Sequence, residues 1–432
     1  MQSTDGTLDG SNSQTHRVLV IDSLARYTDQ QLDRVTASAN IFMDRRWLRL
    51  IDSLDLAPLV RGDLAYRYAV VTQGAEPVAI CPFFVSRSQT IHFAYSFRKA
   101  FFTGWQDELL REKPAMAQVV AWLSRLISAY RTLARATGVH TDGWVLAVSP
   151  LSFRGGIAIA PLASEFRSRV RHLVFDELKA IARQENLPLC MFCIPGEEAE
   201  LREAALAEEM QEAFLTYDTY IELTGLSLDD YLSRFRNRQR AHLKKEIEKV
   251  RRADIRFEVT DRFGSLGITL ASLYEATYMK FGPEFFAHPA SFWEALERHL
   301  GTQAQAILAY RNQELLGFSM LFDKGGKSDP FMYRVGKLST EDLSHLYFSL
   351  VFYEPIRCIA ARGRRRLWLG PSALTTKHHR GAIAHPLYGY FWFPTRRSRL
   401  FLRPYLETFT RFTYQQFAFV NAPNANVKSA LS

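Results

Sequence analysis

A chain of 432 residues is too long for a single hydrophobic core, so we expect two domains of roughly 200 residues each. Its 47% hydrophobic and 23% charged residues are typical of a soluble globular protein. The sequence has no run of 18 apolar residues, which excludes a transmembrane helix, and its four cysteines are too few for a disulfide framework and fit a reducing compartment.

The net charge of +9 is unevenly distributed. Residues 231–252 contain nine Lys or Arg against Glu246 and Glu248, and residues 355–406 contain eleven Lys or Arg and no acid. These segments carry +7 and +11, so the rest of the chain carries a net charge near −9. An anionic partner would therefore meet the C-terminal half, although a basic half packed against an acidic half has the same distribution.

The first half begins with a polar tail and continues with alternating strands and helices. Residues 1–17 lack the basic start and apolar stretch of a signal peptide, so we expect a disordered tail and a cytoplasmic protein. Residues 66–87 predict an antiparallel hairpin. Further strands are predicted at 18–22, 143–153, 187–195 and 215–223. Helices are predicted at 40–54, 113–138, 168–185 and 197–209.

The second half repeats this pattern. A basic helix opens at Ser227, and Asp230 three residues later completes a capping box. Residues 304–326 predict a second hairpin. Strands are predicted at 255–260, 330–336 and 365–370, and helices at 266–281, 289–300 and 345–363. We therefore predict an α/β protein with two domains, 18–226 and 227–432, each a mostly antiparallel sheet flanked by helices.

Cys190 and Cys193 have the CxxC spacing of redox and zinc sites. They lie within the apolar run LPLCMFCIP, and on a strand an odd offset sends two side chains to opposite faces. No second CxxC completes a tetrahedral site. We therefore interpret both as core cysteines.

The stretch TTKHHRG, residues 375–381, brings several basic groups together. A metal site is not expected, because Lys377 and Arg380 flank the adjacent His378 and His379 and residues 355–406 contain no carboxylate. His385 follows nearby without adding an acidic ligand. Lys377 and Arg380 instead border a turn ending at Gly381, an arrangement that suits phosphate or carboxylate. On charge pattern alone, an ordinary solvated loop is the favoured interpretation.

The basic helix within 231–252 leaves a similar choice open. It can face nucleic acid or be solvated, with Glu246 and Glu248 pairing locally. No Walker loop, GxSxG elbow or GxGxxG occurs, which argues against P-loop nucleotide hydrolysis, the esterase elbow and dinucleotide redox. The [RQ]xxGx[GA] loop with which ordinary acetyltransferases bind the CoA pyrophosphate is also missing.

Four segments in order resemble the Fem-like, peptidoglycan-biosynthesis branch of the GNAT acyltransferase superfamily. They are SLDDYLSRFRNRQRAHLKKEIEKV, ELLGFSMLFDKGGKSDPFMYRVG, LYFSLVFYEPIRCIAARG and GPSALTTKHHRGAIAHPLYGYFW. The last is similar to the family's terminal Lys-x-x-Arg-Gly loop. The resemblance covers about residues 200–393 well and 18–200 more weakly.

The chain departs from the family pattern at several positions. Tyr347, Ser349 and Phe352 stand where the family helix has His, Glu and Tyr, while Tyr353 matches and Glu354 replaces Gln. In the loop, Thr375 and Thr376 replace Glu and His. These departures put the substrate, or the activity itself, in doubt.

The resemblance implies two tandem GNAT-like domains that transfer an acyl or aminoacyl group to an amine. Tyr353 and Glu354 would be the catalytic, proton-handling candidates. The substrate would contact Ser349, Tyr347, Tyr333, Arg334, Lys377, Arg380 and Gly381. No tightly bound cofactor is implied: the donor substrate would be an acyl-CoA or an aminoacyl-tRNA, with the missing pyrophosphate loop favouring the latter or an atypical acyl donor. The acceptor would be the amine of a small molecule or cell-wall precursor.

Two other classes of function compete with this one. A non-catalytic binding protein on the same fold would engage RNA or another polyanion through the basic C-terminal half. A scaffold subunit with a purely structural role is the weaker third possibility. The sequence leaves the oligomeric state open.

Overall fold

The computed structural model describes residues 16–62, 64–87, 95–96, 100–101, 117–223, 225, 227–278, 287–326, 328–338, 345–417 and 427. Most of the predicted tail 1–17 lies outside the described residues, but His16 and Arg17 already belong to the first strand. No helix within the described ranges is long and apolar enough to cross a bilayer.

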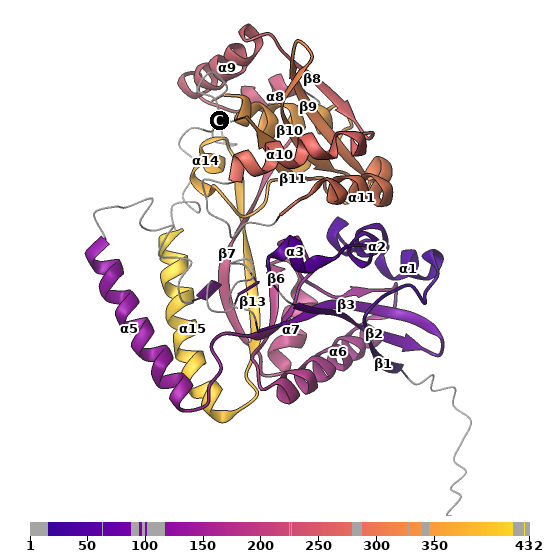
Figure 1. The fold of residues 1–432 in the computed structure, drawn as a ribbon, viewed down its shortest axis with the longest axis vertical. Coiled ribbons are helices and arrows are strands. Elements are labelled where there is room, and N and C mark those ends of the chain that lie inside the picture. Colours follow the sequence, from indigo (N-terminus) through magenta and orange to yellow (C-terminus); the bar gives the residue numbers. More distant parts are fainter. Residues whose placement is uncertain are drawn as a thin grey trace, which may run out of the picture.

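The elements of the first half alternate between strands and helices (Figure 1). The strands are β1 His16–Ile21, β2 Leu64–Gln73, β3 Glu76–Ser86, β4 Trp144–Ala147, β5 Ala158–Ile159, β6 Leu189–Pro195 and β7 Gln211–Glu222. The helices are α1 Asp29–Thr36, η1 Ile41–Met43, α2 Arg45–Asp52, α3 Leu56–Val60, α5 Ala117–Ala136, α6 Ser164–Glu185 and α7 Ala199–Ala207.

The second half has the same mixture of elements. The helices are α8 Leu228–Ser233, α9 Asn237–Arg252, η5 Gly264–Leu266, α10 Gly267–Tyr278, α11 Ala290–Leu300, η7 Gly301–Gln303, α12 Leu346–Phe348, the π-helical turn η9 Ser349–Tyr353, α13 Glu354–Ala360, α14 Leu374–His379 and α15 Arg396–Gln416. The strands are β8 Ile255–Thr260, β9 Ala304–Arg311, β10 Glu314–Phe322, β11 Phe331–Lys337, β12 Arg366–Trp368 and β13 Ile383–Trp392.

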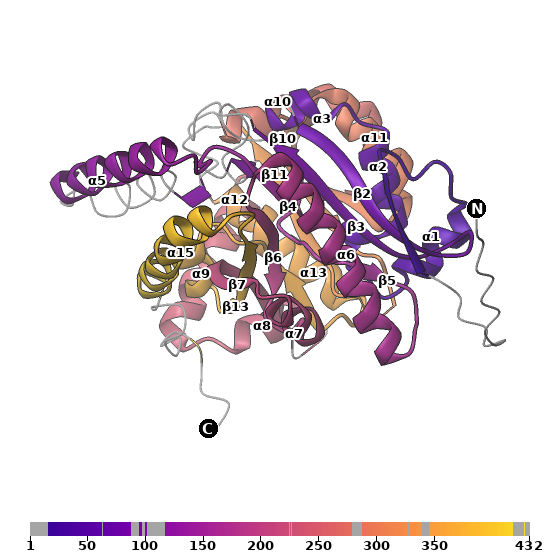
Figure 2. The same ribbon diagram turned by 90° about the horizontal axis from the view of Figure 1, so that it is seen from below.

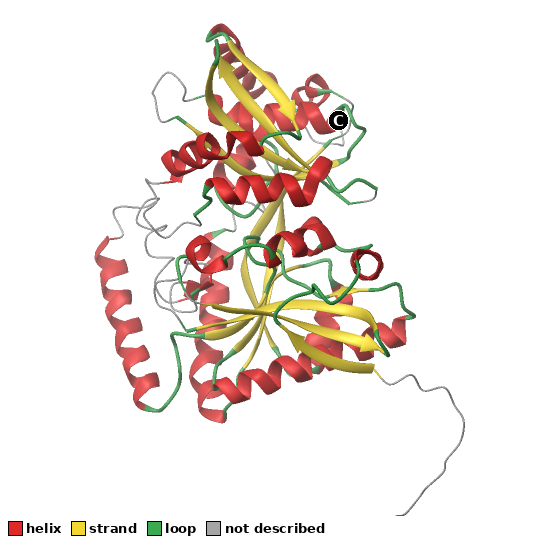
Figure 3. Cartoon of the chain, turned by 45° about the vertical axis from the view of Figure 1, so that its right-hand side comes forward, coloured by secondary structure: helices red, strands yellow, loops and turns green. Residues whose placement is uncertain are grey.

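The described strands form one continuous 13-stranded sheet in the order β1-β2-β3-β4-β6-β13-β7-β12-β11-β10-β9-β8, with β5 paired to β3. The pairs are antiparallel except β4–β6 and β11–β12. Figure 3 shows the strands running through both halves, with helices on their faces. The predicted α/β class and mostly antiparallel sheet are confirmed, but the two expected sheets are joined, because β7 pairs with both β13 and β12.

The connectivity crosses the predicted boundary at 226/227. Strand β13 comes from the second half of the chain and lies between β6 and β7 of the first. Helix α15 packs along α5, where the Tyr130 ring stacks on that of Tyr405 with centroids 5.9 Å apart. Residues 383–416 therefore complete the first half of the fold rather than the second.

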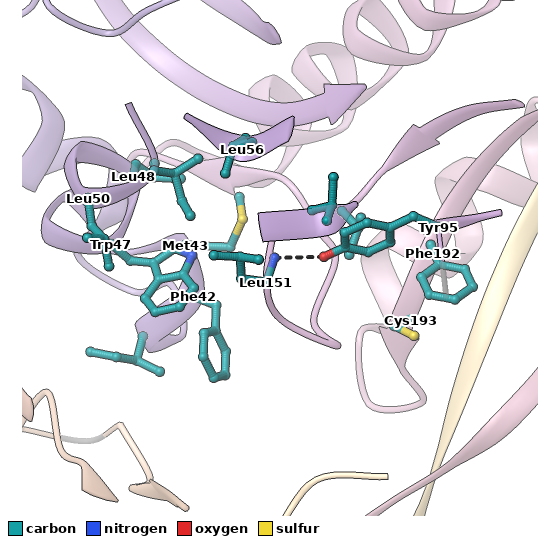
Figure 4. Packing of buried hydrophobic residues seen from close by; sticks show 14 of the residues in the cluster. Phe42, Met43, Trp47, Leu48, Leu50, Leu56, Tyr95, Leu151, Phe192 and Cys193 are labelled. Atoms are coloured by element: carbon teal, nitrogen blue, oxygen red, sulfur yellow. Dashed lines mark hydrogen bonds between the residues drawn. The ribbon is translucent and has the colours of Figure 1, made fainter. Parts of the chain in front are cut away.

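The two halves also share a hydrophobic core. The Trp47 ring of α2 lies 5.9 Å from the Phe322 ring of β10 and 5.5 Å from the Tyr333 ring of β11. Lys324 pairs with Asp44 across the same junction, with the charged atoms 2.8 Å apart. Figure 4 shows the first-half side of this core around Phe42, Met43 and Trp47.

Both CxxC cysteines are buried core residues, as predicted, but the expectation that they face opposite sides of the sheet is wrong. Cys190 and Cys193 belong to the same core cluster, while Met191 and Ile194 belong to the other. The cause is a left-handed backbone at Cys193, with φ of 56°, which breaks the alternation of the strand. Burial raises the pKa of both thiols, so neither favours the reactive thiolate form.

Candidate functional site: two buried charge centres beside α14

The stretch predicted as a basic loop contains the short helix α14. Lys377 lies in this helix and Arg380 caps its C-terminus one turn later, yet their side chains bind different partners. Lys377 donates to backbone carbonyls near β12, and Arg380 donates to a carboxylate on α9. Both cations are buried and have internal partners, so the solvated loop favoured by the charge pattern is wrong, and a role of Lys377 and Arg380 in holding an anionic substrate stays a prediction.

The first cluster is the Arg380–Glu246 centre, formed by Arg380, Glu246, Tyr353, Tyr231 and His242. An Nη of Arg380 donates to both carboxylate oxygens of Glu246, at 2.7 and 3.0 Å. Only 3% of Glu246 is exposed, so its charge requires this partner. The Tyr231 hydroxyl donates to the Arg380 carbonyl at 2.7 Å. The pair therefore ties α9 to the end of α14.

Tyr353 brings the π-helical turn η9 into the same centre. Its hydroxyl donates to the Glu246 carboxylate, and burial, followed by that bond and charge, raises the pKa of the phenol. The Arg380 guanidinium lies over the rings of Phe348 and Phe352, at 3.6 and 5.2 Å from their centroids. π-Helical turns are rare and are frequently found at functional sites. The turn supplies Phe352 and Tyr353, and α12 just before it supplies Phe348, so two aromatic rings and one phenol surround a single ion pair.

The centre reaches the surface through His242. The Nε2 of this histidine lies 3.3 Å from Oε1 of Glu246, and its side chain is 63% exposed. A buried carboxylate that contacts a solvent-accessible imidazole has the geometry in which an acid orients a base. The centre therefore joins a buried carboxylate to an imidazole that is open to solvent.

The second cluster is the Arg154–Asp218 centre, formed by Arg154, Asp218, Trp368 and Lys377. Nη2 of Arg154 donates to Asp218 at 2.6 Å, and its guanidinium lies 4.1 Å from the Trp368 ring centroid. Lys377 is 2% exposed and donates to the carbonyls of Leu369 and Gly370, each at 2.7 Å. Burial lowers the pKa of Lys377 to about 7, an effect that Asp218 partly offsets.

Tyr333 and Arg334 bind the backbone of the first half. The Tyr333 hydroxyl and the Arg334 guanidinium donate to the Leu151 carbonyl at 3.1 and 3.0 Å. Leu151 has a left-handed backbone with φ of 60°, and its N–H donates to the Tyr95 hydroxyl at 2.7 Å (Figure 4). Such a conformation is unfavourable for leucine and needs surrounding bonds to persist. These two predicted substrate contacts therefore also fix the junction between the halves.

The remaining predicted site residues lie around the Arg380–Glu246 centre without joining its bonds. Ser349 is buried in η9, and the Tyr347 ring meets the Phe348 ring edge-on at 5.7 Å. Glu354 is turned toward Arg357, 3.3 Å away, and burial raises the pKa of its carboxyl. Gly381 has φ of 74° and lies so close to Phe235 that an added Cβ would be 3.0 Å from the ring.

Three charged residues of these centres were missed in the sequence. In the solvated alternative for the basic helix, both acids pair locally: Glu248 does so with Arg251 and Arg252, but Glu246 is buried and binds Arg380. Its position was a usable signal, because Glu246 falls on the apolar stripe of Leu243, Ile247 and Val250. The sequence signals for the other two residues were weaker. Arg154 only stands before two glycines, and Asp218 is an acid inside an apolar strand.

Helix α9 also presents a cationic stripe beside the Arg380–Glu246 centre. The stripe consists of exposed residues at spacings of three and four, which place side chains on one helix face: Arg238, His242, Lys245, Lys249 and Arg252. Lys249 Nζ lies 2.9 Å from Nε2 of His345, just ahead of η9. Part of the predicted basic surface thus borders the buried carboxylate.

The predicted metal-capable histidines have other surroundings. His385 pairs with Glu197 and meets the Trp368 ring edge-on at 5.7 Å. The His379 carbonyl accepts a bond from Gln239 of α9. Across the part of the chain that the structure describes, no three His, Cys, Asp or Glu side chains gather as metal ligands would.

Comparisons with known proteins agree with the resemblance seen in the motifs. Residues 133–424, about two thirds of the chain, match the model of the FemAB-like family, described as peptidoglycan biosynthesis/recognition. The match contains both charge centres. A search of proteins with curated functions finds no sequence match.

Similar solved structures cover most of the chain. FemX is 11% identical with a TM-score of 0.51, and the match covers 90% of this chain and 98% of FemX, so the two share a fold. A tandem GNAT protein from the clavulanic acid biosynthesis pathway is 11% identical with a TM-score of 0.41, over 88% and 99% of the two chains. The C-terminal domain of a putative lysylphosphatidylglycerol synthetase from Agrobacterium fabrum is 12% identical with a TM-score of 0.43, over 62% and 82%.

Proposed function

Because the chain belongs to the FemAB-like family of peptidoglycan biosynthesis and recognition proteins, we propose that it forms an amide on a cell-wall precursor. An acyl or aminoacyl group moves from an activated donor to an amine of the precursor. The new bond joins the amine nitrogen to the carbonyl carbon, the thioester or ester bond of the donor breaks, and the proton lost by the amine ends on the sulfur or oxygen that leaves as a thiol or alcohol. The reaction needs a bound donor, an oriented amine and a proton acceptor.

One observation carries this proposal: the His242 imidazole contacts a buried carboxylate that Arg380 and Tyr353 fix in place. We assign His242 as the base that takes the proton of the attacking amine. Glu246 orients the imidazole and stabilises its charged form, as an acidic partner does for a histidine base. Tyr353 and Arg380 then act as positioning residues, because their polar groups bind Glu246.

The cationic stripe on α9 supports a polyanionic donor. Acyl-CoA and aminoacyl-tRNA both carry phosphates, and exposed Arg and Lys at one-turn intervals can follow such a charge. The stripe contains His242, so a donor bound along it lies beside the proposed base. Aminoacyl-tRNA remains the preferred donor, since the chain lacks the usual CoA pyrophosphate loop.

A binding and transfer assay tests these roles together. Purified protein is titrated with acetyl-CoA, a long-chain acyl-CoA and charged tRNA at several salt concentrations, and amide formation on a peptidoglycan-precursor amine is followed by mass spectrometry. His242→Gln should lower kcat at least about 100-fold with little change in donor affinity, the loss typical of a missing general base. Failure of all three donors to bind would overturn the proposal.

Helix α9 offers a matched control for the donor surface. Replacing Arg238, Lys245 and Lys249 by Gln should make the slope of log K for tRNA binding against log salt concentration less steep by about two to three, the loss expected for two to three phosphate contacts. Replacing Arg240, Lys244 and Arg251 by Gln removes the same charge from the opposite face of the helix. Equal losses in both variants would mean that net charge, not the stripe, binds the donor.

A non-catalytic binding protein is the second candidate function, favoured by the internal bonding of Lys377 and Arg380. Neither cation of the Lys-x-x-Arg-Gly loop is directed at solvent in this structure. Such a protein would bind RNA with steep salt dependence and form no amide with any donor. The cytoplasmic location and the lack of a tightly bound cofactor stay predictions.

A further inference from the structure

Helices α5 and α15, which pack on each other, concentrate exposed apolar side chains. Ten large hydrophobic side chains of the described residues are exposed, and half of them lie on α5 and α15. On α5 they are Trp122, Leu126 and Leu133, with exposed fractions of 59, 48 and 56%; on α15 they are Leu400 and Tyr414, at 71 and 52%. Figure 2 shows this helix pair projecting from one side of the molecule.

The apolar residues of α5 form an ordered stripe. Trp122, Leu126 and Leu133 follow the helical spacing of four and seven residues, with the small Ala129 between them. The side chains of Tyr130, Arg131 and Ala134 instead face inward, and Tyr130 packs on α15. The exposed stripe is therefore a second apolar face, separate from the one that attaches α5 to the protein.

The neighbouring helix, which packs on α5 through Phe401 and Tyr405, carries exposed positive charge. Helix α15 has five exposed arginines, and its single acid, Glu407, pairs with one of them. They are Arg396, Arg397, Arg399, Arg403 and Arg411. Exposed Trp and Leu on one helix and exposed arginines on the helix packed against it suit the boundary of an anionic bilayer, where rings and aliphatic chains enter the acyl region and guanidinium groups meet phosphates.

We propose that the α5–α15 face, formed by the exposed residues of these two helices, docks on the surface of an anionic lipid membrane. A second copy of the chain fits this face less well. A symmetric contact would set the arginines of one copy against those of the other without matching carboxylates. Docking of this face does not depend on the transfer chemistry proposed above, and its residues are separate from both charge centres.

Vesicle binding by the full-length protein tests this face. The probes are vesicles of phosphatidylcholine alone and with 30% phosphatidylglycerol, measured by co-sedimentation at low and physiological salt. We expect binding to the anionic vesicles only, weakened by salt, together with a blue shift of tryptophan emission. That shift should be smaller in Trp122→Phe, because Trp122 is the ring that enters the lipid.

Two variants and one control distinguish binding through this face from non-specific binding by exposed apolar side chains. Trp122→Gln with Leu126→Gln, and Arg396, Arg397 and Arg399 all replaced by Gln, should each weaken vesicle binding by about tenfold or more. The control is Ile268→Gln on α10, which removes an 80% exposed side chain elsewhere. Absence of binding to anionic vesicles, or equal loss in the control, would overturn the proposal. A dimer in light scattering that Leu126→Gln dissociates would assign the face to a second copy instead.

Discussion

The two buried charge centres on either side of α14 are similar in composition and different in access. Each pairs one arginine with one carboxylate and places the guanidinium against aromatic rings. The Arg380–Glu246 centre opens to solvent at His242, whereas Lys377 beside the Arg154–Asp218 centre is almost fully buried. A buried ion pair alone therefore does not identify an active site; a contact with an exposed titratable group distinguishes one pair from the other.

The largest effect on stability is expected in the Arg154–Asp218 centre. Asp218→Asn leaves the Arg154 guanidinium buried without a carboxylate, which should lower the free energy of unfolding by about 3–5 kcal/mol. Urea denaturation measures the loss. Adding Arg154→Met to this variant removes the unpaired charge and should recover part of the stability. A loss under about 1 kcal/mol in Asp218→Asn would mean that water reaches this centre too.

Glu246→Gln should have the next largest effect and lower the free energy of unfolding by about 2–3 kcal/mol, because Arg380 loses its anionic partner near an opening to solvent. Transfer activity should fall with it, since His242 loses the group that orients it. Glu248→Gln, two residues along α9, is the matched control. Glu248 is half-buried and pairs with the exposed side chains of Arg251 and Arg252 on the surface, so neither quantity should change measurably. Similar losses in both variants would remove the distinction between the two acids.

The lowered pKa of Lys377 predicts that stability depends on pH through the Arg154–Asp218 centre and not through the Arg380–Glu246 centre. The pKa of Lys377 is near 7 in the folded protein and near 10.4 when unfolded, so the unfolded chain binds more protons between these values. The free energy of unfolding should therefore rise with pH, by roughly 2 kcal/mol between pH 7 and 9, relative to Lys377→Met. Denaturation curves of both proteins at several pH values test this. Parallel pH profiles would show that Lys377 is charged throughout.

Tyr353→Phe should have the smallest effect and lower the free energy of unfolding by about 1 kcal/mol, because Glu246 stays paired with Arg380 after it loses the bond from the phenol. The readout that separates positioning from packing is kcat, measured beside urea denaturation. We expect a lower kcat with unchanged donor affinity. Unchanged kcat in a stable Tyr353→Phe protein would limit this tyrosine to packing.

Local patterns in the sequence predicted most helices and strands, and the exceptions have physical reasons. Strand β13 was missed because Pro386 and Gly389 interrupt its pattern, and α15 contains Pro404. The loop cations Lys377 and Arg380 were identified, but their partners were not. Arg380 and Glu246 are 134 positions apart, and Arg154 and Asp218 are 64 apart, so only the folded chain brings them together.

The place of β13 in the sheet has a consequence for how the protein is made. The ribosome synthesises β6 and β7 well before residues 383–392. Until β13 has been synthesised, the edges of β6 and β7 that pair with it remain unpaired. Those edges close only when nearly the whole chain has been synthesised. Completion of the sheet is thus a late event, and a chain stopped near residue 226 would lack the strand that lies between β6 and β7.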